Sequence, residues 1–136
     1  FMAHKQKPDF NLKLAIQLAL LHDILEDTAL SFKSLKADFG NVVAEGVLAL
    51  TKDSTLDKKD QMQDCLTRIA EHDKEVAIVK LCDRITNLQK PPVKWDKEKI
   101  KKYHLQSASI AQALEGKNAY LDKRILSKIN DFAAFV

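Results

Sequence analysis

Residues 19–28 read ALLHDILEDT and place four ionisable side chains at the end of an otherwise apolar helix. These are His22, Asp23, Glu26 and Asp27. In one helix over residues 11–25, the i to i+4 spacing puts the histidine over the glutamate and the first aspartate over the second. Burying such groups unpaired is expensive, and one divalent cation between them would offset that cost. The alternative is a frayed helix end with solvated carboxylates and a histidine that binds no ligand.

A second helix carries a similar anomaly. The stretch VAIVKLCDRITNL, residues 76–88, has Lys80, Asp83 and Asn87 on one stripe at i, i+3 and i+7. Core helices seldom bury charged residues without a partner. Asp83 either pairs internally with Arg84, Lys80 or Arg68, or is a hard oxygen ligand that faces the histidine and aspartate of the first helix. The second interpretation predicts a metal site between two helices of a bundle.

The rest of the chain also has the pattern of helices. No short stretch alternates strictly between apolar and polar residues, so the predicted fold class is all-α. Asn11 and Ser31 are candidate N-caps, and Gly40 and Gly116 are candidate helix stops. The helix after Asn11 is apolar on nearly all sides, which places it at the centre of a single helical bundle. The other predicted helices cover residues 31–40, 42–50, 58–71, 75–88, 97–114 and 118–135.

The composition limits the class of function. The 136 residues suffice for one domain, and a net charge of +3 is too mild to indicate bulk nucleic-acid binding. Residues 90–102 hold six lysines and two carboxylates, a basic rim suited to a small anionic ligand. No apolar run approaches the roughly 20 residues of a membrane span, so a cytoplasmic location is expected. Cys65 and Cys82 are expected to be reduced core thiols.

Several linked motifs carry a family resemblance. The stretch ALLHDILEDT resembles the HD-domain metal-dependent phosphohydrolases. With FG at 39–40, LTK at 50–52 and VKLCDRITNL at 79–88, the chain is similar, over almost its whole length, to the hydrolase domain of RelA/SpoT homologues. Tyr103 and the stretch LEGKN at 114–118 resemble the stand-alone small alarmone hydrolases in particular. The resemblance implies a single HD-domain helical bundle.

The same resemblance implies a reaction and a set of residues. The reaction would be Mn²⁺-dependent hydrolysis of guanosine 3′-diphosphate 5′-diphosphate or its 5′-triphosphate relative, with GDP or GTP and pyrophosphate as products. The partner would be this small nucleotide, with no nucleic acid or membrane involved. By role, the residues would be His22, Asp23 and Asp83 as metal ligands, Glu26 and Asp27 as the catalytic acidic pair, Asn87 and Tyr103 as nucleotide contacts, and Lys58 and Lys99 as phosphate-facing lysines.

The sequence departs from the family at its start. The family's first metal ligand is a histidine roughly two dozen residues before the His-Asp pair, a place that falls before Phe1. His4 is 18 residues before His22 and is interpreted as an ordinary residue near a helix end. We therefore expect residues 1–136 to be an HD-type domain whose N-terminal part precedes Phe1. Two alternatives remain, a phosphatase acting on another phosphorylated nucleotide and a degenerate nucleotide-binding domain without turnover.

Overall fold

The computed structural model describes residues 1–136 and contains helices but no strand. The predicted all-α class is therefore confirmed. No helix combines the length and the hydropathy needed to cross a bilayer. The elements are α1 Met2–Gln6, α2 Leu12–Leu21, α3 Ile24–Asp27, α4 Phe32–Phe39, α5 Asn41–Leu50, α6 Lys58–Glu71, α7 Lys74–Asn87, α8 Lys97–Ala113, α9 Ala119–Phe132 and the short 3-10 helix η1 Ala133–Phe135.

Side-chain caps mark where many of these helices begin. Asn11, Ser31, Asp96 and Asn118 each accept a hydrogen bond from the backbone N–H three residues further on. Such a bond satisfies one of the N–H groups that the first turn of a helix leaves free. Gly40 adopts φ +88°, a left-handed conformation that favours glycine, and there α4 ends and α5 begins. The caps predicted at Asn11 and Ser31 are confirmed.

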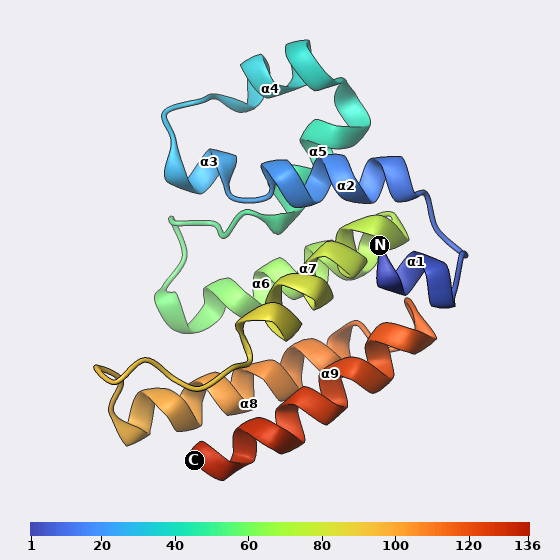
Figure 1. Ribbon diagram of the computed structural model, residues 1–136. Helices are drawn as coiled ribbons and strands as arrows, with labels where there is room; N and C mark the ends of the chain where they lie inside the picture. Colours follow the sequence, from blue (N-terminus) through green and yellow to red (C-terminus); the bar gives the residue numbers. More distant parts are fainter.

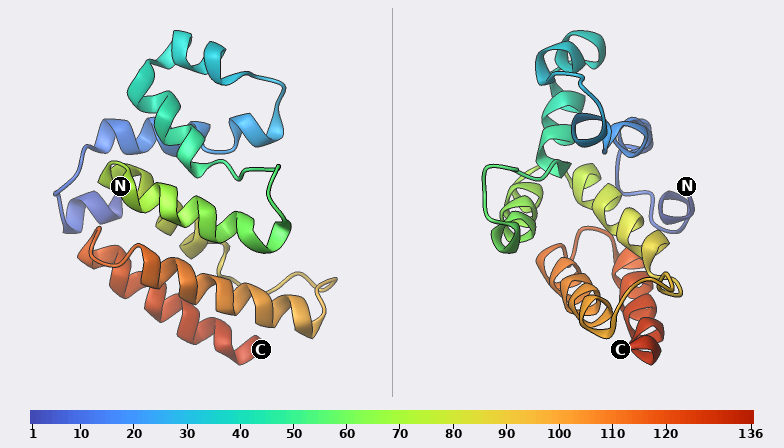
Figure 2. Two further views of the ribbon diagram at one scale, coloured as in Figure 1. Left: turned by 180° about the vertical axis from the view of Figure 1, so that it is seen from behind. Right: turned by 90° about the vertical axis from the view of Figure 1, so that its left-hand side faces the viewer.

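Helix α7 lies in the middle of the molecule. It packs against α2 and α5 on one side, against α8 and α9 on the other, and also against α6. Figure 1 shows this arrangement as three tiers, with α2 to α5 above, α6 and α7 between, and α8 and α9 below. The two further views agree with it (Figure 2). The residues that α7 buries are Val76, Ala77, Ile78, Val79, Leu81, Arg84 and Ile85.

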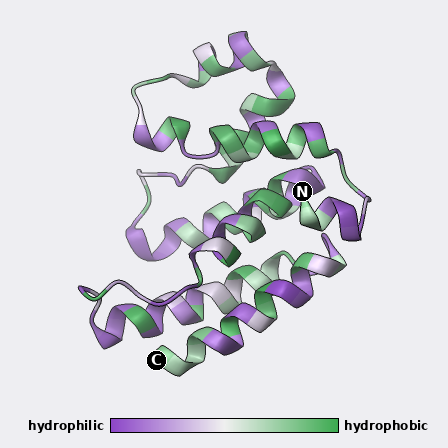
Figure 3. Cartoon of the chain, viewed as in Figure 1, coloured by the Kyte–Doolittle hydropathy of each residue, from purple (hydrophilic) through white to green (hydrophobic).

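Two expectations about burial are wrong. Helix α2 is not central, because it buries only Ala15 and Leu18, and Leu20 is 80% exposed. Figure 3 shows apolar residues along this outer helix, where they line a groove of about 270 Å³ with side chains of α1 and α7. Cys65 is buried as expected, but Cys82 lies on the groove side of α7 and is exposed. Apolar periodicity alone does not say which faces find a partner.

The predicted helix over residues 11–25 is broken at its functional end. Helix α2 ends at Leu21 and α3 begins at Ile24, so His22 and Asp23 lie at the bend. Nδ1 of His22 donates a hydrogen bond to the carbonyl oxygen of Ala19, 2.7 Å away. In an uninterrupted helix that carbonyl would accept the backbone N–H of Asp23 instead. The imidazole therefore takes over a helical acceptor, and the prediction of one continuous helix is wrong.

Candidate active site

A cavity of about 170 Å³ opens where the ends of several helices meet, and it gathers most of the predicted site residues. Helices α2 and α3 contribute the His-Asp bend and the glutamate, and α7 contributes its polar stripe. The end of α5 and parts of α6 and α8 complete the wall. The lining residues are His22, Asp23, Glu26, Leu50, Lys52, Met62, Val79, Lys80, Asp83, Arg84, Asn87 and Tyr103.

The imidazole of His22 is the centre of a three-residue cluster. Its Nε2 lies 3.1 Å from Oδ2 of Asp23 and 3.6 Å from Oδ1 of Asp83. Because Nδ1 carries the proton given to Ala19, Nε2 is left with a lone pair that can bind a cation. Asn87 donates a hydrogen bond of 3.2 Å to Oδ1 of Asp83, which restrains that carboxylate. One nitrogen and two carboxylates from two helices thus converge on one point.

The spacing within this cluster is close to that of a metal's ligands. Two ligand atoms that each lie about 2.1 Å from an ion, with a ligand–ion–ligand angle of about 90°, are about 3 Å apart. The distances of 3.1 and 3.6 Å from Nε2 to the two carboxylates are near that value. No group of three or more His, Cys, Asp and Glu side chains in this structure is arranged so that it could hold a metal ion. The cluster therefore has the donor types that suit a divalent ion, but its side chains do not form a metal-binding set as they stand.

The charges around Asp23 also favour a cation. Burial raises the pKa of the Asp23 carboxyl, and the neighbouring His22 opposes that rise. The carboxylates of Asp27, Asp83 and Glu26 raise the pKa further, since like charges disfavour the ionised form. Neighbouring carboxylates that repel one another electrostatically are stabilised when a positive charge lies among them.

The two acidic residues of α3 differ in position. Glu26 lines the cavity, and its Oε1 accepts the backbone N–H of Lys52 at 2.8 Å, from the loop that follows α5. Asp27 is exposed at the end of α3 and does not line the cavity, although it acts electrostatically on Asp23. The structure therefore fixes one oxygen of Glu26 and leaves the other free to bind a proton.

Arg84 does not pair with Asp83, which was one alternative that the sequence left open. Its guanidinium donates to Oε1 of Gln106 at 2.8 Å and to Oγ of Ser107 at 3.2 Å. It also lies 4.0 Å from the ring centroid of Tyr103, within range for a cation-π interaction. Burial raises the pKa of the Tyr103 hydroxyl, an effect that Arg84 opposes. Arg84 therefore joins α7 to α8 and leaves Asp83 free to face His22.

Lysines contribute to the site in a way that the sequence did not assign. Lys80 and Lys52 both line the cavity, and neither ammonium makes an ion pair. Burial lowers the pKa of Lys80. A lysine within an apolar helix was the only signal for Lys80. The predicted phosphate-facing residues Lys58 and Lys99 lie outside the cavity wall, and Lys99 is 4.8 Å from the ring centroid of Trp95.

The chain is similar to hydrolases of guanosine polyphosphates. It is 30% identical to the guanosine-3′,5′-bis(diphosphate) 3′-pyrophosphohydrolase MESH1 of Danio rerio. The alignment spans 114 residues and covers 81% of this chain and 63% of that protein. It is 35% identical over 80 residues to the guanosine-3′,5′-bis(diphosphate) 3′-pyrophosphohydrolase of Vibrio cholerae, 54% of this chain and 11% of that one. No family model matches the chain.

Solved structures show the same architecture. One is described as "A metazoan ortholog of SpoT hydrolyzes ppGpp and plays a role in starvation responses". It superimposes with a TM-score of 0.81 and 25% identity over 96% of this chain and 75% of that one. A Listeria monocytogenes protein shares the fold, with a TM-score of 0.74 at 17% identity over 96% of this chain and 90% of that one.

The fold and the His-Asp pair at its bend are similar to those of HD-type hydrolase domains, a class that implies a divalent metal ion. Within that class, the resemblance to the guanosine polyphosphate hydrolases of the RelA/SpoT homologues is confirmed. The chain spans just under two thirds of the length of the Danio rerio relative, 63%.

Proposed function

We propose that residues 1–136 form an HD-type domain that hydrolyses guanosine 3′-diphosphate 5′-diphosphate, or its 5′-triphosphate relative, to GDP or GTP and pyrophosphate. The observation that carries the proposal is the convergence of Nε2 of His22 with carboxylate oxygens of Asp23 and Asp83, at 3.1 and 3.6 Å, in the cavity that Glu26 also lines. The relatives named for this reaction support the choice of substrate.

The three donors of the cluster would hold the metal ion, and Mn²⁺ is the ion we propose. His22 would bind through Nε2, because its Nδ1 is engaged with a backbone carbonyl. Asp23 and Asp83 would each bind through a carboxylate oxygen. When bound, such an ion polarises a phosphoryl oxygen and lowers the pKa of a water molecule toward neutrality.

Glu26 would act as the general base. A water molecule attacks the phosphorus next to the ribose 3′ oxygen, and Glu26 accepts the proton that the water loses. The bond from phosphorus to the 3′ oxygen breaks, its electron pair stays on that oxygen, and a proton converts it to the 3′ hydroxyl of GDP or GTP. The oxygen of the water leaves with the pyrophosphate. Asp27, one residue further along α3, is proposed to act on the leaving group.

Other residues that line the cavity would bind the nucleotide. Lys80 and Lys52 supply positive charge there, and a phosphate group would provide the negative partner that neither ammonium has within the protein. Asn87 and Tyr103 line the same cavity and are proposed to contact the nucleotide. Lys58 and Lys99, outside the wall, are proposed to reach the outer phosphates of a bound substrate through their flexible side chains.

The test is release of GDP and pyrophosphate from the guanosine tetraphosphate by the protein, with and without added Mn²⁺. Asp83→Ala should abolish both Mn²⁺ binding and turnover with the helical fold retained. Glu26→Gln should keep Mn²⁺ binding and retain only a small residual turnover. Asp38→Asn is the matched control, because Asp38 is an exposed carboxylate of α4 away from the cavity, and it should behave as wild type.

The possible failures of this experiment are distinguishable. Tight Mn²⁺ binding without release of pyrophosphate would favour a phosphatase acting on another phosphorylated nucleotide. Nucleotide binding without Mn²⁺ binding would favour a degenerate binding domain. Full activity of Asp83→Ala would remove the metal-site model altogether.

A further inference from the structure

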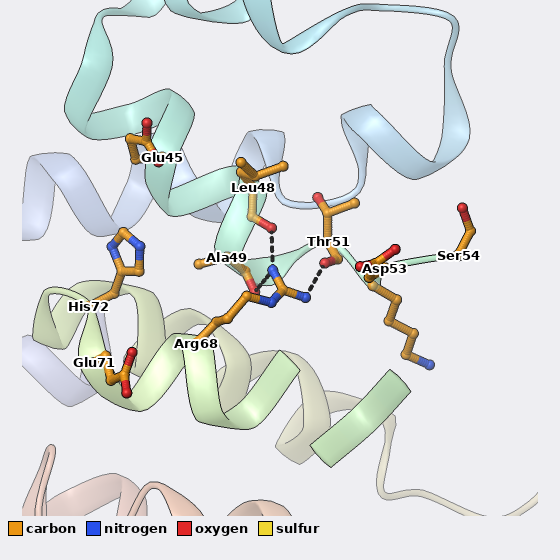
Figure 4. Close-up of a pocket in the computed structure, with 10 residues that line it drawn as sticks. Glu45, Leu48, Ala49, Thr51, Asp53, Ser54, Arg68, Glu71 and His72 are labelled. Atoms are coloured by element: carbon orange, nitrogen blue, oxygen red, sulfur yellow. Dashed lines mark hydrogen bonds between the residues drawn. The ribbon is translucent and has the colours of Figure 1, made fainter. Parts of the chain in front are cut away.

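A second hollow of about 490 Å³ lies next to the cavity of the candidate active site and shares Lys52 with it. It is bounded by the end of α5, the loop after α5, and α6 (Figure 4). Arg68 of α6 extends across this hollow toward α5, and Figure 4 shows its guanidinium among backbone carbonyl groups. The sequence left Arg68 open as a partner of Asp83, but its ion pair is with Asp64.

The guanidinium of Arg68 is fully engaged with the end of α5. Nη1 donates to the carbonyl oxygen of Leu48 at 2.8 Å and to that of Ala49 at 3.3 Å. Nη2 donates to the carbonyl oxygen of Thr51 at 2.8 Å, and Nε donates to Asp64 at 3.0 Å. The last carbonyl groups of a helix lack partners within the helix, and a positive charge there is favourable. Arg68 thereby joins the end of α5 to α6.

One peptide group connects this arginine to the candidate general base. The carbonyl oxygen of Thr51 accepts from Arg68, and the N–H of the same peptide unit, that of Lys52, donates to Oε1 of Glu26 at 2.8 Å. The two groups belong to one rigid plane, so the hydrogen bond on the oxygen sets the direction of the N–H. Hydrogen bonds in series also polarise one another, which strengthens the bond to Glu26.

We infer that Arg68 is a positioning residue for Glu26 and acts through the peptide group between Thr51 and Lys52. This inference rests on the proposed function, in which Glu26 accepts a proton from water. Arg68 does not line the active-site cavity, so its loss should lower kcat and leave KM for the nucleotide unchanged. Removal of a hydrogen bond of this kind corresponds to about a tenfold loss of kcat.

A double-mutant cycle separates positioning from a general structural role. Arg68→Met should lower kcat about tenfold, but in the Glu26→Gln background the same change should alter the residual kcat less than about twofold. Arg124→Met is the control, because Arg124 is exposed on α9 and makes no ion pair, and it should leave kcat unchanged. Equal loss of kcat in both backgrounds would overturn the inference.

A second pair of variants tests the link at the peptide group itself. Lys52→Pro removes the N–H that Glu26 accepts, whereas Lys52→Ala removes the same side chain and keeps the N–H. Thr51 has φ −88° and ψ 128°, a conformation that permits a following proline. Lys52→Pro should have a lower kcat than Lys52→Ala, and Arg68→Met should add no further loss to it. Similar kcat values for the two Lys52 variants would contradict the inference.

Amide hydrogen exchange tests the same link without any activity. In the wild-type protein the Lys52 amide should exchange slowly, and Arg68→Met should accelerate its exchange at least about tenfold. Exchange at amides in the middle of α9 should not change. Slow exchange retained in Arg68→Met would overturn the inference, even for a protein that hydrolyses the nucleotide. Failure of the wild-type protein to hydrolyse any guanosine polyphosphate would overturn the proposed function alone.

Discussion

Gly46 lies where α5 crosses α2 and α7, and replacing it with alanine tests the packing that holds the candidate active site together. A Cβ at this position would lie 2.6 Å from Cδ2 of Leu18 and 3.3 Å from Cγ2 of Val76. Both neighbours are buried, Leu18 completely, so neither can move aside freely. The same crossing sets the distance between the end of α2, which carries His22, and the end of α5, which leads to Lys52.

The expected change in stability is a difference between two opposing effects. Alanine within a helix is favoured over glycine by about 1 kcal/mol. An extra methyl group forced into a packed core destabilises by about 1–3 kcal/mol. The difference between these two effects spans about 0–2 kcal/mol. We therefore expect Gly46→Ala to lower the free energy of unfolding by about 1 kcal/mol, the middle of that range. In a domain of this size the melting temperature should fall by about 4 °C.

The assay is thermal and urea unfolding followed by circular dichroism. In a Leu18→Val background, the change in the free energy of unfolding caused by Gly46→Ala should have the opposite sign. Valine at position 18 has no δ carbons, so the atom nearest to the new Cβ is gone. In this background Gly46→Ala should raise stability by less than about 1 kcal/mol, because the gain in helix propensity is then opposed only by the contact of 3.3 Å with Cγ2 of Val76. If Gly46→Ala stabilises the otherwise wild-type protein by that amount, the close approach of α5 to α2 is refuted.

Two further predictions concern buried groups near the site. Lys80→Met should raise the melting temperature at pH 7, because burial of the ammonium lowers the pKa of Lys80 in the folded state below its unfolded value. Below that lowered pKa the charged ammonium destabilises the folded state, so the variant should be more stable than the wild type there. This difference in stability should fade as the pH rises toward 10.5, the usual lysine pKa. A difference that stays constant up to that pH would contradict this reasoning. The two thiols should react with an aromatic disulfide reagent at very different rates, Cys82 in the folded protein and Cys65 only after unfolding, because Cys82 is exposed and Cys65 is buried. Desolvation raises the pKa of both thiols, so the contrast rests on access to the reagent. Cys82→Ser should remove the fast phase, and a fast phase that persists in this variant would show that Cys65 is accessible.

The candidate site could be predicted from the sequence where a polar residue interrupts an apolar helix. Polar residues in apolar helices identified His22, Asp23 and Asp83 before their contacts were known, and those three do meet. The roles of Arg84 and Arg68 could not be predicted, since their partners on other elements are a glutamine, a serine and backbone carbonyl groups, which no sequence pattern marks. Long side chains of this kind report on how helices pack, and a single sequence holds no record of that packing.

The sequence by itself determined that the chain is helical, where its helices begin, and which polar residues interrupt apolar faces. These are local properties, set by periodicity, by caps such as Asn11 and Ser31, and by the left-handed conformation at Gly40. Only the tertiary structure decided that α7, and not α2, is the central helix, because burial depends on which helices pack on either side and is settled when the whole chain folds. The break at the His-Asp pair accompanies a local hydrogen bond from His22 to Ala19, three residues earlier, which apolar periodicity does not register.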